Sequence, residues 1–217
     1  MRTTLKKGNE DFIIGVDEVG RGAVAGPVAV GAVLMTADTY HNYQTEWDTL
    51  RDSKKLTQKG REKWCEYISA KIAENTMLAK CSQVQATTID KIGIVKSVSQ
   101  AANKSISSLL PTPTTTTTPN TPTKKGIILC DAGIKIKKPA KYQVINIIRG
   151  DEKEPIIALA SIWAKVFRDK LMLKHSKNFD NYGFDKNKGY GTKSHLEAIR
   201  KNGTTIHHRT SFLKMYF

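Results

Sequence analysis

The chain has 217 residues, of which 35 are Lys or Arg and 20 are Asp or Glu, so its formal net charge is +15. Hydrophobic residues make up 39%, and no stretch approaches the roughly 18 consecutive apolar residues of a transmembrane helix, so we expect no membrane-spanning protein. The charged first residues do not resemble a secretory signal and the three cysteines lack CxxC spacing, so we expect a cytoplasmic protein without disulfides or a zinc site.

The first part of the chain predicts two strands and a helix. Apolar runs at residues 12–16 and 27–35 flank a glycine-rich turn and are typical of neighbouring strands. After a polar start at Thr57, apolar residues recur at intervals of four, which predicts an amphipathic helix.

The rest of the chain mixes strands and helices. Apolar residues at intervals of three and four predict an amphipathic helix from Thr88 to Leu109, and an apolar helix is predicted from Pro155 to about Met172. Strands are predicted at residues 77–84, 126–130 and 142–148. This mixture indicates an α/β fold in which helices cover a sheet.

Residues 111–123, PTPTTTTTPNTPT, differ in composition from the rest of the chain. The segment has no apolar side chain to bury and contains four prolines, which indicates an exposed loop. An interdomain linker is the alternative, but the flanking segments look like successive elements of one layer. We therefore expect a single domain over residues 1–217, with this insertion and a helical C-terminal region from about residue 172.

The positive charge is uneven along the chain. Residues 1–123 have a net charge of +3, whereas residues 124–217 have +12. Such a surplus attracts polyanions, because each Lys or Arg that neutralises a phosphate releases a condensed counterion. Nucleic acid is the favoured partner, and an anionic membrane surface or the ribosome is the alternative.

Four acidic residues lie at the ends of apolar runs: Asp17, Glu18, Asp131 and Asp151. One strand-end acid alone is usually a solvated turn former. Acids from three segments would instead meet at the edge of an α/β sheet where ligand sites form. Clustered carboxylates repel one another unless cations lie between them, and oxygen ligands suit Mg²⁺ or Mn²⁺. With the basic surplus, this pattern predicts a metal-dependent nuclease that uses two cations.

The stretch from Gly20 to Gly22, with Arg21 between the two glycines, gives a second, weaker signal. Glycines let the backbone approach a ligand closely, so its N–H and C=O groups can form hydrogen bonds there. From these residues alone, a tight turn with an exposed Arg21 is the favoured interpretation.

Several longer motifs resemble type 2 ribonuclease H, ribonuclease HII. In chain order they are GVDEVGRGAVAGPVAVGAV at 15–33, DSKKLT at 52–57, RGDEKEPIIALASIWAKVFRDKLM at 149–172, GYGTKSHLEAI at 189–199 and HHRTSF at 207–212. The resemblance implies a ribonuclease H-like fold, with a mixed central sheet flanked by helices and a C-terminal helical region. It also implies hydrolysis of the RNA strand of RNA–DNA hybrids. A further implication is incision of duplex DNA 5' to embedded ribonucleotides, with 3'-hydroxyl and 5'-phosphate products.

The resemblance also assigns roles to residues. Asp17, Glu18, Asp131 and Asp151 match the family's four catalytic, metal-binding acids. The turn of Gly20, Arg21 and Gly22 matches an element that senses the ribose 2'-hydroxyl, the group by which a protein tells RNA from DNA. Tyr190 matches a tyrosine that packs on the neighbouring deoxyribose. Four basic residues within the matched blocks are assigned to phosphate contact: Lys54, Lys55, Lys165 and Arg168.

The chain departs from the family pattern at two places. Ala132 and Gly133 follow Asp131 where Gly-Asn is usual, and Gly93 stands where Asn is frequent. Neither change removes an expected metal ligand.

Other residues carry further interpretations. Asp169 is expected to be an ion-pair partner on its helix, and a structural or phosphate-adjacent role for His207 and His208 is favoured over a proton shuttle. The C-terminal residues Leu213, Tyr216 and Phe217 have the spacing of a motif that binds a sliding clamp, although Thr210 stands where that motif usually has Gln. Packing of this segment on the domain is the alternative.

Two other functions fit parts of the pattern. A type 3 ribonuclease H shares the acids but prefers long hybrids. A noncatalytic nucleic-acid-binding protein would explain the basic surplus alone. The Gly20–Gly22 turn and the lack of room for a separate N-terminal binding domain favour the type 2 enzyme over type 3, and the presence of all four acids argues against a noncatalytic protein. We expect the type 2 enzyme to act as a monomer.

Overall fold

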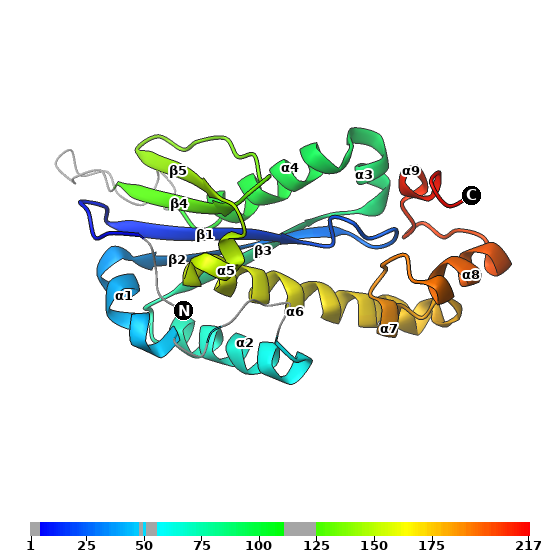
Figure 1. Cartoon of the computed structure of the whole chain (residues 1–217), viewed down its shortest axis with the longest axis horizontal. Coiled ribbons are helices and arrows are strands. Elements are labelled where there is room, and N and C mark those ends of the chain that lie inside the picture. Colours follow the sequence, from blue (N-terminus) through cyan, green and yellow to red (C-terminus); the bar gives the residue numbers. More distant parts are fainter. Residues whose placement is uncertain (1–4, 48–49, 51–55, 111–124) are drawn as a thin grey trace.

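The computed structural model describes residues 5–47, 50, 56–110 and 125–217. Its centre is a five-stranded sheet with the strand order β3-β2-β1-β4-β5 (Figure 1). The strands are β1 (Phe12–Val19), β2 (Val28–Thr36), β3 (Leu78–Val84), β4 (Gly126–Asp131) and β5 (Tyr142–Ile147). β1, β2 and β3 pair antiparallel, whereas β4 pairs parallel with both β1 and β5. The sheet is therefore mixed, and β1 lies at its centre.

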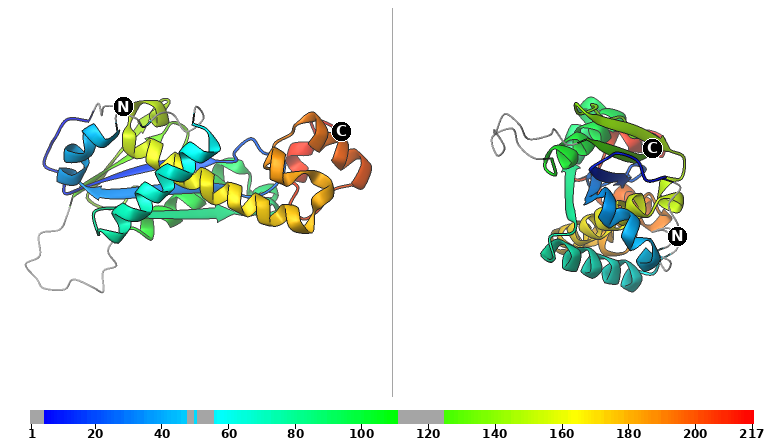
Figure 2. Two further views of the ribbon diagram at one scale, coloured as in Figure 1. Left: turned by 90° about the horizontal axis from the view of Figure 1, so that it is seen from below. Right: turned by 90° about the vertical axis from the view of Figure 1, so that its left-hand side faces the viewer.

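Helices cover both faces of the sheet (Figure 1). α3 (Ala86–Ile92) and α4 (Ile94–Ser107) lie on one face. The other face is covered by α6 (Pro155–Asn178), with α1 (Ala37–Asn42) and α2 (Gln58–Ala73) beside it. The shorter elements are η1 (Tyr43–Trp47), α5 (Gly150–Lys153), η3 (Asp180–Tyr182), α7 (Phe184–Asn187), α8 (Lys193–Asn202) and α9 (Thr210–Leu213). The last four form a C-terminal region beyond the end of the sheet (Figure 2).

The alternation of side chains along β1 divides the hydrophobic core in two. Ile14 packs in the cluster on the α4 side, together with Val98, whereas its neighbour Ile13 packs in the cluster on the α6 side, together with Ile156. A third cluster lies in the C-terminal region and includes Phe184. Because both faces of β1 are buried, its sequence is an almost unbroken apolar run, and the acids at its end are conspicuous.

The sheet and α6 approach each other closely at glycines. A Cβ on Gly15 would collide with the carbonyl of Ile156, and a Cβ on Gly31 would collide with the carbonyl of Ala160. The absence of side chains at these two positions lets α6 lie directly on β1 and β2. This close packing brings the first turns of α6 next to the acidic end of β1.

The predicted helices are largely confirmed, with one correction. Thr57 caps α2, because its hydroxyl accepts a hydrogen bond from the amide of Gly60 at 3.1 Å. The single helix predicted from Thr88 to Leu109 is wrong, since Gly93 adopts φ +81° and separates α3 from α4. The apolar spacing misled here, because Ile92 and Val95 beside the break are exposed, whereas Ile89 and Val98 pack in the core cluster on the α4 side. α1 and η1 were not predicted, and α6 extends six residues past Met172.

Among the described helices, none combines the length and the apolar character that crossing a membrane requires. Lys54, Lys55 and the Thr/Pro-rich segment at 111–123 lie outside the described residues.

Candidate active site

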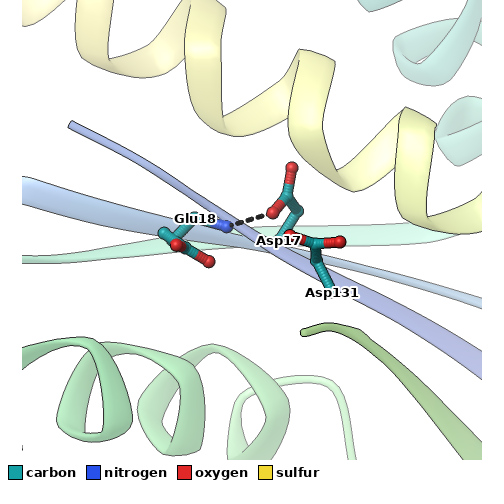
Figure 3. A group of neighbouring side chains, drawn as sticks. All are labelled: Asp17, Glu18 and Asp131. Atoms are coloured by element: carbon teal, nitrogen blue, oxygen red, sulfur yellow. Dashed lines mark hydrogen bonds between the residues drawn. The ribbon is translucent and has the colours of Figure 1, made fainter. Parts of the chain in front are cut away.

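The parallel pairing of β1 and β4 brings two of the predicted acids together. Val16 pairs with Cys130, so the next residues, Asp17 and Asp131, follow side by side at the ends of their strands. Glu18 is the adjacent residue of β1. One carboxylate oxygen from each of these three acids lies within 4.8 Å of the others (Figure 3).

Backbone amides orient two of these carboxylates. The amide of Glu18 donates to Asp17 Oδ1 at 2.8 Å, and the amide of Gly150 donates to Asp131 Oδ1 at 2.7 Å. Glu18 Oε1 accepts from Arg21 at 2.9 Å. Its other oxygen, Oε2, is buried and has no hydrogen-bond partner among the described atoms. A buried carboxylate oxygen without a partner is unfavourable unless a cation completes the site.

The electrostatics of the group also favour a bound cation. Burial raises the pKa of Asp17 well above its ordinary value, and the charges of Glu18, Asp131 and Asp151 raise it further, against a hydrogen bond from Ser161 that lowers it. Burial likewise raises the pKa of Glu18, and Arg21 opposes this shift. The folded protein therefore holds negative charge at this place at a free-energy cost, which a divalent cation would relieve.

Asp151, the fourth predicted acid, lies next to this group and outside its 4.8 Å limit. It is the second residue of α5 and is 2% exposed. Its charge contributes to the raised pKa of Asp17, which places it within electrostatic reach of the group. The structure thus brings three of the four acids into direct proximity and places the fourth beside them.

The Gly20–Gly22 turn lies at the end of β1, beside the acids. Gly20 has φ +82°, and a Cβ there would collide with the Arg168 side chain, so this position requires glycine. Arg21 bridges Glu18 and the carbonyl of Gly133, to which it donates at 3.3 Å. Thus Gly133, in the segment that departs from the family pattern, supplies a backbone acceptor for the expected recognition residue. A Cβ on Gly22 would meet no described atom within 4 Å.

Arg168 does not occupy the position expected of a phosphate contact. Its side chain is 0% exposed, and it donates to the carbonyls of Pro27 (2.8 Å), Lys188 (2.8 Å) and Ala25 (3.1 Å). The pattern of charges in the sequence could not distinguish this role from phosphate binding, because both use a guanidinium on the same helix. The structure corrects the assignment: Arg168 connects the chain that follows the turn to the segment before Tyr190.

Arg209, which sequence reasoning did not single out, plays a similar part. It is also fully buried and donates to the carbonyls of Arg21 and Gly26, each at 3.0 Å. The available signal was its place in the HHRTSF block. Together, Arg168 and Arg209 bind four backbone carbonyls between Arg21 and Pro27, so two buried cations fix the shape of the turn and the loop after it.

A cleft of about 370 Å³ is lined by Asp17, Glu18 and Asp131 together with the Gly20–Gly22 turn and Tyr190. Tyr190 is 36% exposed, and its ring lies against the Arg168 guanidinium, 5.5 Å away. Lys165 also lines the cleft and forms an ion pair with Asp169 at 2.7 Å, which confirms the role predicted for Asp169. Two further lining residues, Arg61 and Ser161, were missed. Ser161 lies in the matched block at 149–172, which is the signal that could have indicated it, whereas Arg61 lies in none of the matched motifs.

The C-terminal residues have mixed environments. Leu213 is buried at 5% exposure in the third core cluster, whereas Tyr216 and Phe217 are 37% and 57% exposed. His208 is buried as well, and both of its ring nitrogens take part in hydrogen bonds inside the C-terminal region. The structural role favoured for His208 is confirmed.

A carboxylate group of this kind, on a mixed sheet of this order with helices on both faces, defines a metal-dependent nuclease of the ribonuclease H class. The model of the Ribonuclease HII family matches residues 14–217. Ribonuclease HII of Pelagibacter ubique is 39% identical over 201 residues, which is 93% of this chain and 95% of that protein. Ribonuclease HII of Bacillus subtilis is 38% identical over 201 residues, 93% of this chain and 69% of that protein.

The chain therefore belongs to the ribonuclease HII family. As a member of this family, it is a metal-dependent endoribonuclease that acts on RNA–DNA hybrids.

Solved structures confirm the expected fold. The structure of the PCNA:RNase HII complex from Archaeoglobus fulgidus matches with a TM-score of 0.67 at 21% identity, over 91% of this chain and 93% of that chain. Bst-RNase HIII in complex with Mn²⁺ also matches with a TM-score of 0.67, at 15% identity, over 94% of this chain and 68% of that chain. These likenesses establish the ribonuclease H-like architecture that the sequence motifs implied.

Proposed function

We propose that the enzyme incises duplex DNA on the 5' side of embedded ribonucleotides, in addition to hydrolysing the RNA strand of hybrids. The observation that carries this proposal is the composition of one cleft. Three of the acids, Asp17, Glu18 and Asp131, line it beside the Gly20–Gly22 turn, and Tyr190 lines it too. Cleavage and selection of a single ribonucleotide can then occur on one bound strand.

We assign two divalent cations, Mg²⁺ or Mn²⁺, to the four acids Asp17, Glu18, Asp131 and Asp151. The residues fit such ions, because the donor set is all oxygen and the buried Glu18 Oε2 has no hydrogen-bond partner among the described atoms. Bound there, the cations would activate the attacking water and stabilise the leaving 3'-oxygen. The products would be a 3'-hydroxyl and a 5'-phosphate.

The remaining residues of the cleft position the substrate in this proposal. The backbone of the Gly20–Gly22 turn and the Arg21 side chain contact the ribose 2'-hydroxyl, which is recognised and does not attack. The exposed ring of Tyr190 packs on the next deoxyribose. Lys165, which lines the same cleft and pairs with Asp169, contacts a phosphate. The assignments of Lys54 and Lys55 to phosphate contact stay predictions, since both residues lie outside the described part of the chain.

A duplex DNA that contains one ribonucleotide tests the function directly. With Mg²⁺ or Mn²⁺, we expect a single cut on the 5' side of the ribonucleotide, with a 3'-hydroxyl on the upstream DNA and a 5'-phosphate on the ribonucleotide. Cleavage of long hybrids without this cut would instead indicate type 3 specificity. Binding of both duplexes without cleavage would indicate a noncatalytic protein.

The two glycines of the turn provide a matched test of substrate contact. Gly22→Ala places a methyl group in open space, so we expect its thermal midpoint to stay within about 2 °C of wild type. If the ribose approaches this backbone, the same variant loses at least ~10-fold in single-ribonucleotide incision. Gly20→Ala is the comparison. The added methyl group would collide with the Arg168 side chain at a position with positive φ, so this variant should also lose stability. Normal incision by a folded Gly22→Ala protein would contradict the proposed contact.

Three further assignments accompany the proposal. We propose that the chain acts as a single-domain monomer in the cytoplasm. We also propose that the exposed Tyr216 and Phe217 contact a sliding clamp while Leu213 stays in the C-terminal core. The Archaeoglobus fulgidus relative is described in complex with PCNA, which supports this partner. Unchanged clamp affinity after deletion of Tyr216 and Phe217 would remove the assignment.

A further inference from the structure

Two buried histidines form a continuous hydrogen-bond chain that ends at the backbone of Tyr190. His195 belongs to α8, and His208 lies in the segment between α8 and α9. Their side chains are 0% and 2% exposed, and their Nε2 atoms lie 3.2 Å apart. Neither residue lines the cleft that holds the acids.

The groups at the two ends of this hydrogen-bond chain determine which ring nitrogens carry protons. The amide of Thr205 donates to His208 Nδ1 at 2.9 Å, and an amide can only donate, so this nitrogen carries no proton. The Tyr190 carbonyl lies 2.8 Å from His195 Nδ1, and a carbonyl can only accept, so that nitrogen carries one.

The contact between the rings then has one consistent solution. A neutral His208 without a proton on Nδ1 has its proton on Nε2, which donates to His195 Nε2. A neutral His195 with a proton on Nδ1 has a free acceptor at Nε2. The tautomers deduced from the two ends therefore agree. A metal ion between the Nε2 atoms is excluded, because His208 Nε2 must keep its proton.

The surroundings keep both rings neutral. Burial lowers the pKa of His195, and burial together with the neighbouring His195 and His207 lowers the pKa of His208 to about 4. The rings of Tyr182 and Phe184 also pack against the pair, at centroid distances of 4.9 and 5.4 Å. A second proton on either ring would bring two N–H groups face to face. On His208 it would face the Thr205 amide, and on His195 it would face the Nε2–H of His208.

We propose that His195 and His208 are positioning residues, which hold the Tyr190 backbone through the ordered chain from the Thr205 amide to the Tyr190 carbonyl. This inference rests on the proposed role of Tyr190 in selecting the ribonucleotide junction. The hydrogen-bond chain also connects Tyr190 to the loop after the Gly20–Gly22 turn, because the backbone of His208 pairs with that of Ala25 in an isolated β-bridge. The pair thereby fixes the spacing of the two substrate-selecting elements.

The tautomers are measurable without any substrate. Long-range ¹H–¹⁵N spectra of the histidine rings at pH 7 should show His208 protonated only on Nε2 and His195 only on Nδ1. Assignment follows from His195→Asn and His208→Asn. A charged ring at pH 7, or a proton on His195 Nε2, would overturn the proposal, whether or not the enzyme incises single ribonucleotides.

Substitutions at His195 separate positioning from packing. An Asn amide can occupy the place of Nδ1 and keep the donor to Tyr190, whereas a Gln amide reaches only the place of Nε2. We expect His195→Asn to retain single-ribonucleotide incision within about 3-fold and His195→Gln to lose about 10-fold, which matches one hydrogen bond. Cleavage of a long hybrid should fall less in His195→Gln than incision does.

The control is His207→Asn. The ring of His207 packs on the ring of His175 in the same region and is not part of the hydrogen-bond chain. It should retain the selectivity of wild type. Equal losses by His195→Asn and His195→Gln, on both substrates, would mean that His195 only fills space and would refute the proposal. If wild type itself makes no single-ribonucleotide cut, the proposed function fails, and the ring spectra still decide the tautomers.

Discussion

We expect Asp17→Asn to abolish cleavage and to stabilise the metal-free protein. Loss of a metal-binding carboxylate forfeits several kcal/mol of transition-state stabilisation, which corresponds to at least ~10³-fold in rate. Hybrid binding should persist, because the basic surface is unchanged. Rates on a hybrid and on a single-ribonucleotide duplex, with affinities measured in parallel, check this expectation. Robust cleavage by Asp17→Asn would contradict the assignment of the metal site.

The stability gain has a defined pH dependence. Because the pKa of Asp17 is raised above 3.8 in the folded protein, the folded state holds its proton at pH values where the unfolded chain has lost it. The wild-type protein therefore loses stability as pH rises from about 4 through the raised pKa, and the neutral amide of Asp17→Asn removes this loss. In a chelator, we expect Asp17→Asn to exceed wild type by about 1–2 kcal/mol at pH 7 and to equal it near pH 4.

Chemical denaturation at a series of pH values measures this difference. Asp38→Asn is the matched control, because Asp38 is an exposed acid that pairs with Lys7 far from the cleft. The control should keep full activity and show no stability gain at pH 7. A constant difference between wild type and Asp17→Asn at all pH values would show that the pKa of Asp17 is not the cause.

Arg168→Met should unfold far more easily than wild type. The substitution leaves three backbone carbonyls without their donor, at about 1 kcal/mol or more for each. We expect a loss of at least ~3 kcal/mol, which lowers the thermal midpoint by about 6–12 °C. Calorimetry or circular dichroism measures this shift. Arg168→Lys should restore little, because an ammonium cannot reproduce the planar fork of donors.

The salt dependence of duplex binding distinguishes this role from phosphate contact. Each lost phosphate contact reduces the slope of log affinity against log salt by about 0.9. We expect this reduction for Lys165→Met and no reduction for Arg168→Met. Lys170→Met, which removes an equal charge from an exposed position on the same helix, is the stability control. A stable Arg168→Met protein with a reduced slope would restore the original assignment.

Local patterns in the sequence predicted the elements and the acids well. The apolar runs located all five strands. β1, β2 and β4 are buried on both faces and have few polar residues, whereas the edge strands β3 and β5 are partly exposed. Asp17, Glu18 and Asp131 were found because a carboxylate at the end of such a run is unusual. The break at Gly93 was not predicted, since the apolar spacing on its two sides is continuous and only the backbone angle reveals it.

The roles of the buried arginines and histidines could not be predicted in the same way. A buried Arg168 and a half-buried Lys165 lie three residues apart on one helix, and their different environments depend on contacts with segments distant in sequence. The hydrogen-bond chain from the Thr205 amide to the Tyr190 carbonyl could not be predicted either. The direction of its hydrogen bonds follows from which atoms face each other in the folded protein.

The uninterrupted course of α6 links the two halves of the cleft. Near its N-terminal end the helix places Ser161 beside Asp17, and two turns later it places Arg168 beneath Tyr190. A helix advances 1.5 Å and turns about 100° with each residue. Deletion of one residue between Ser161 and Arg168 would therefore rotate the guanidinium away from its carbonyls while the acids stayed in place. In the proposed function, the distance between the bond that is cut and the sugar that contacts Tyr190 would therefore be set by the number of residues between two positions of one helix.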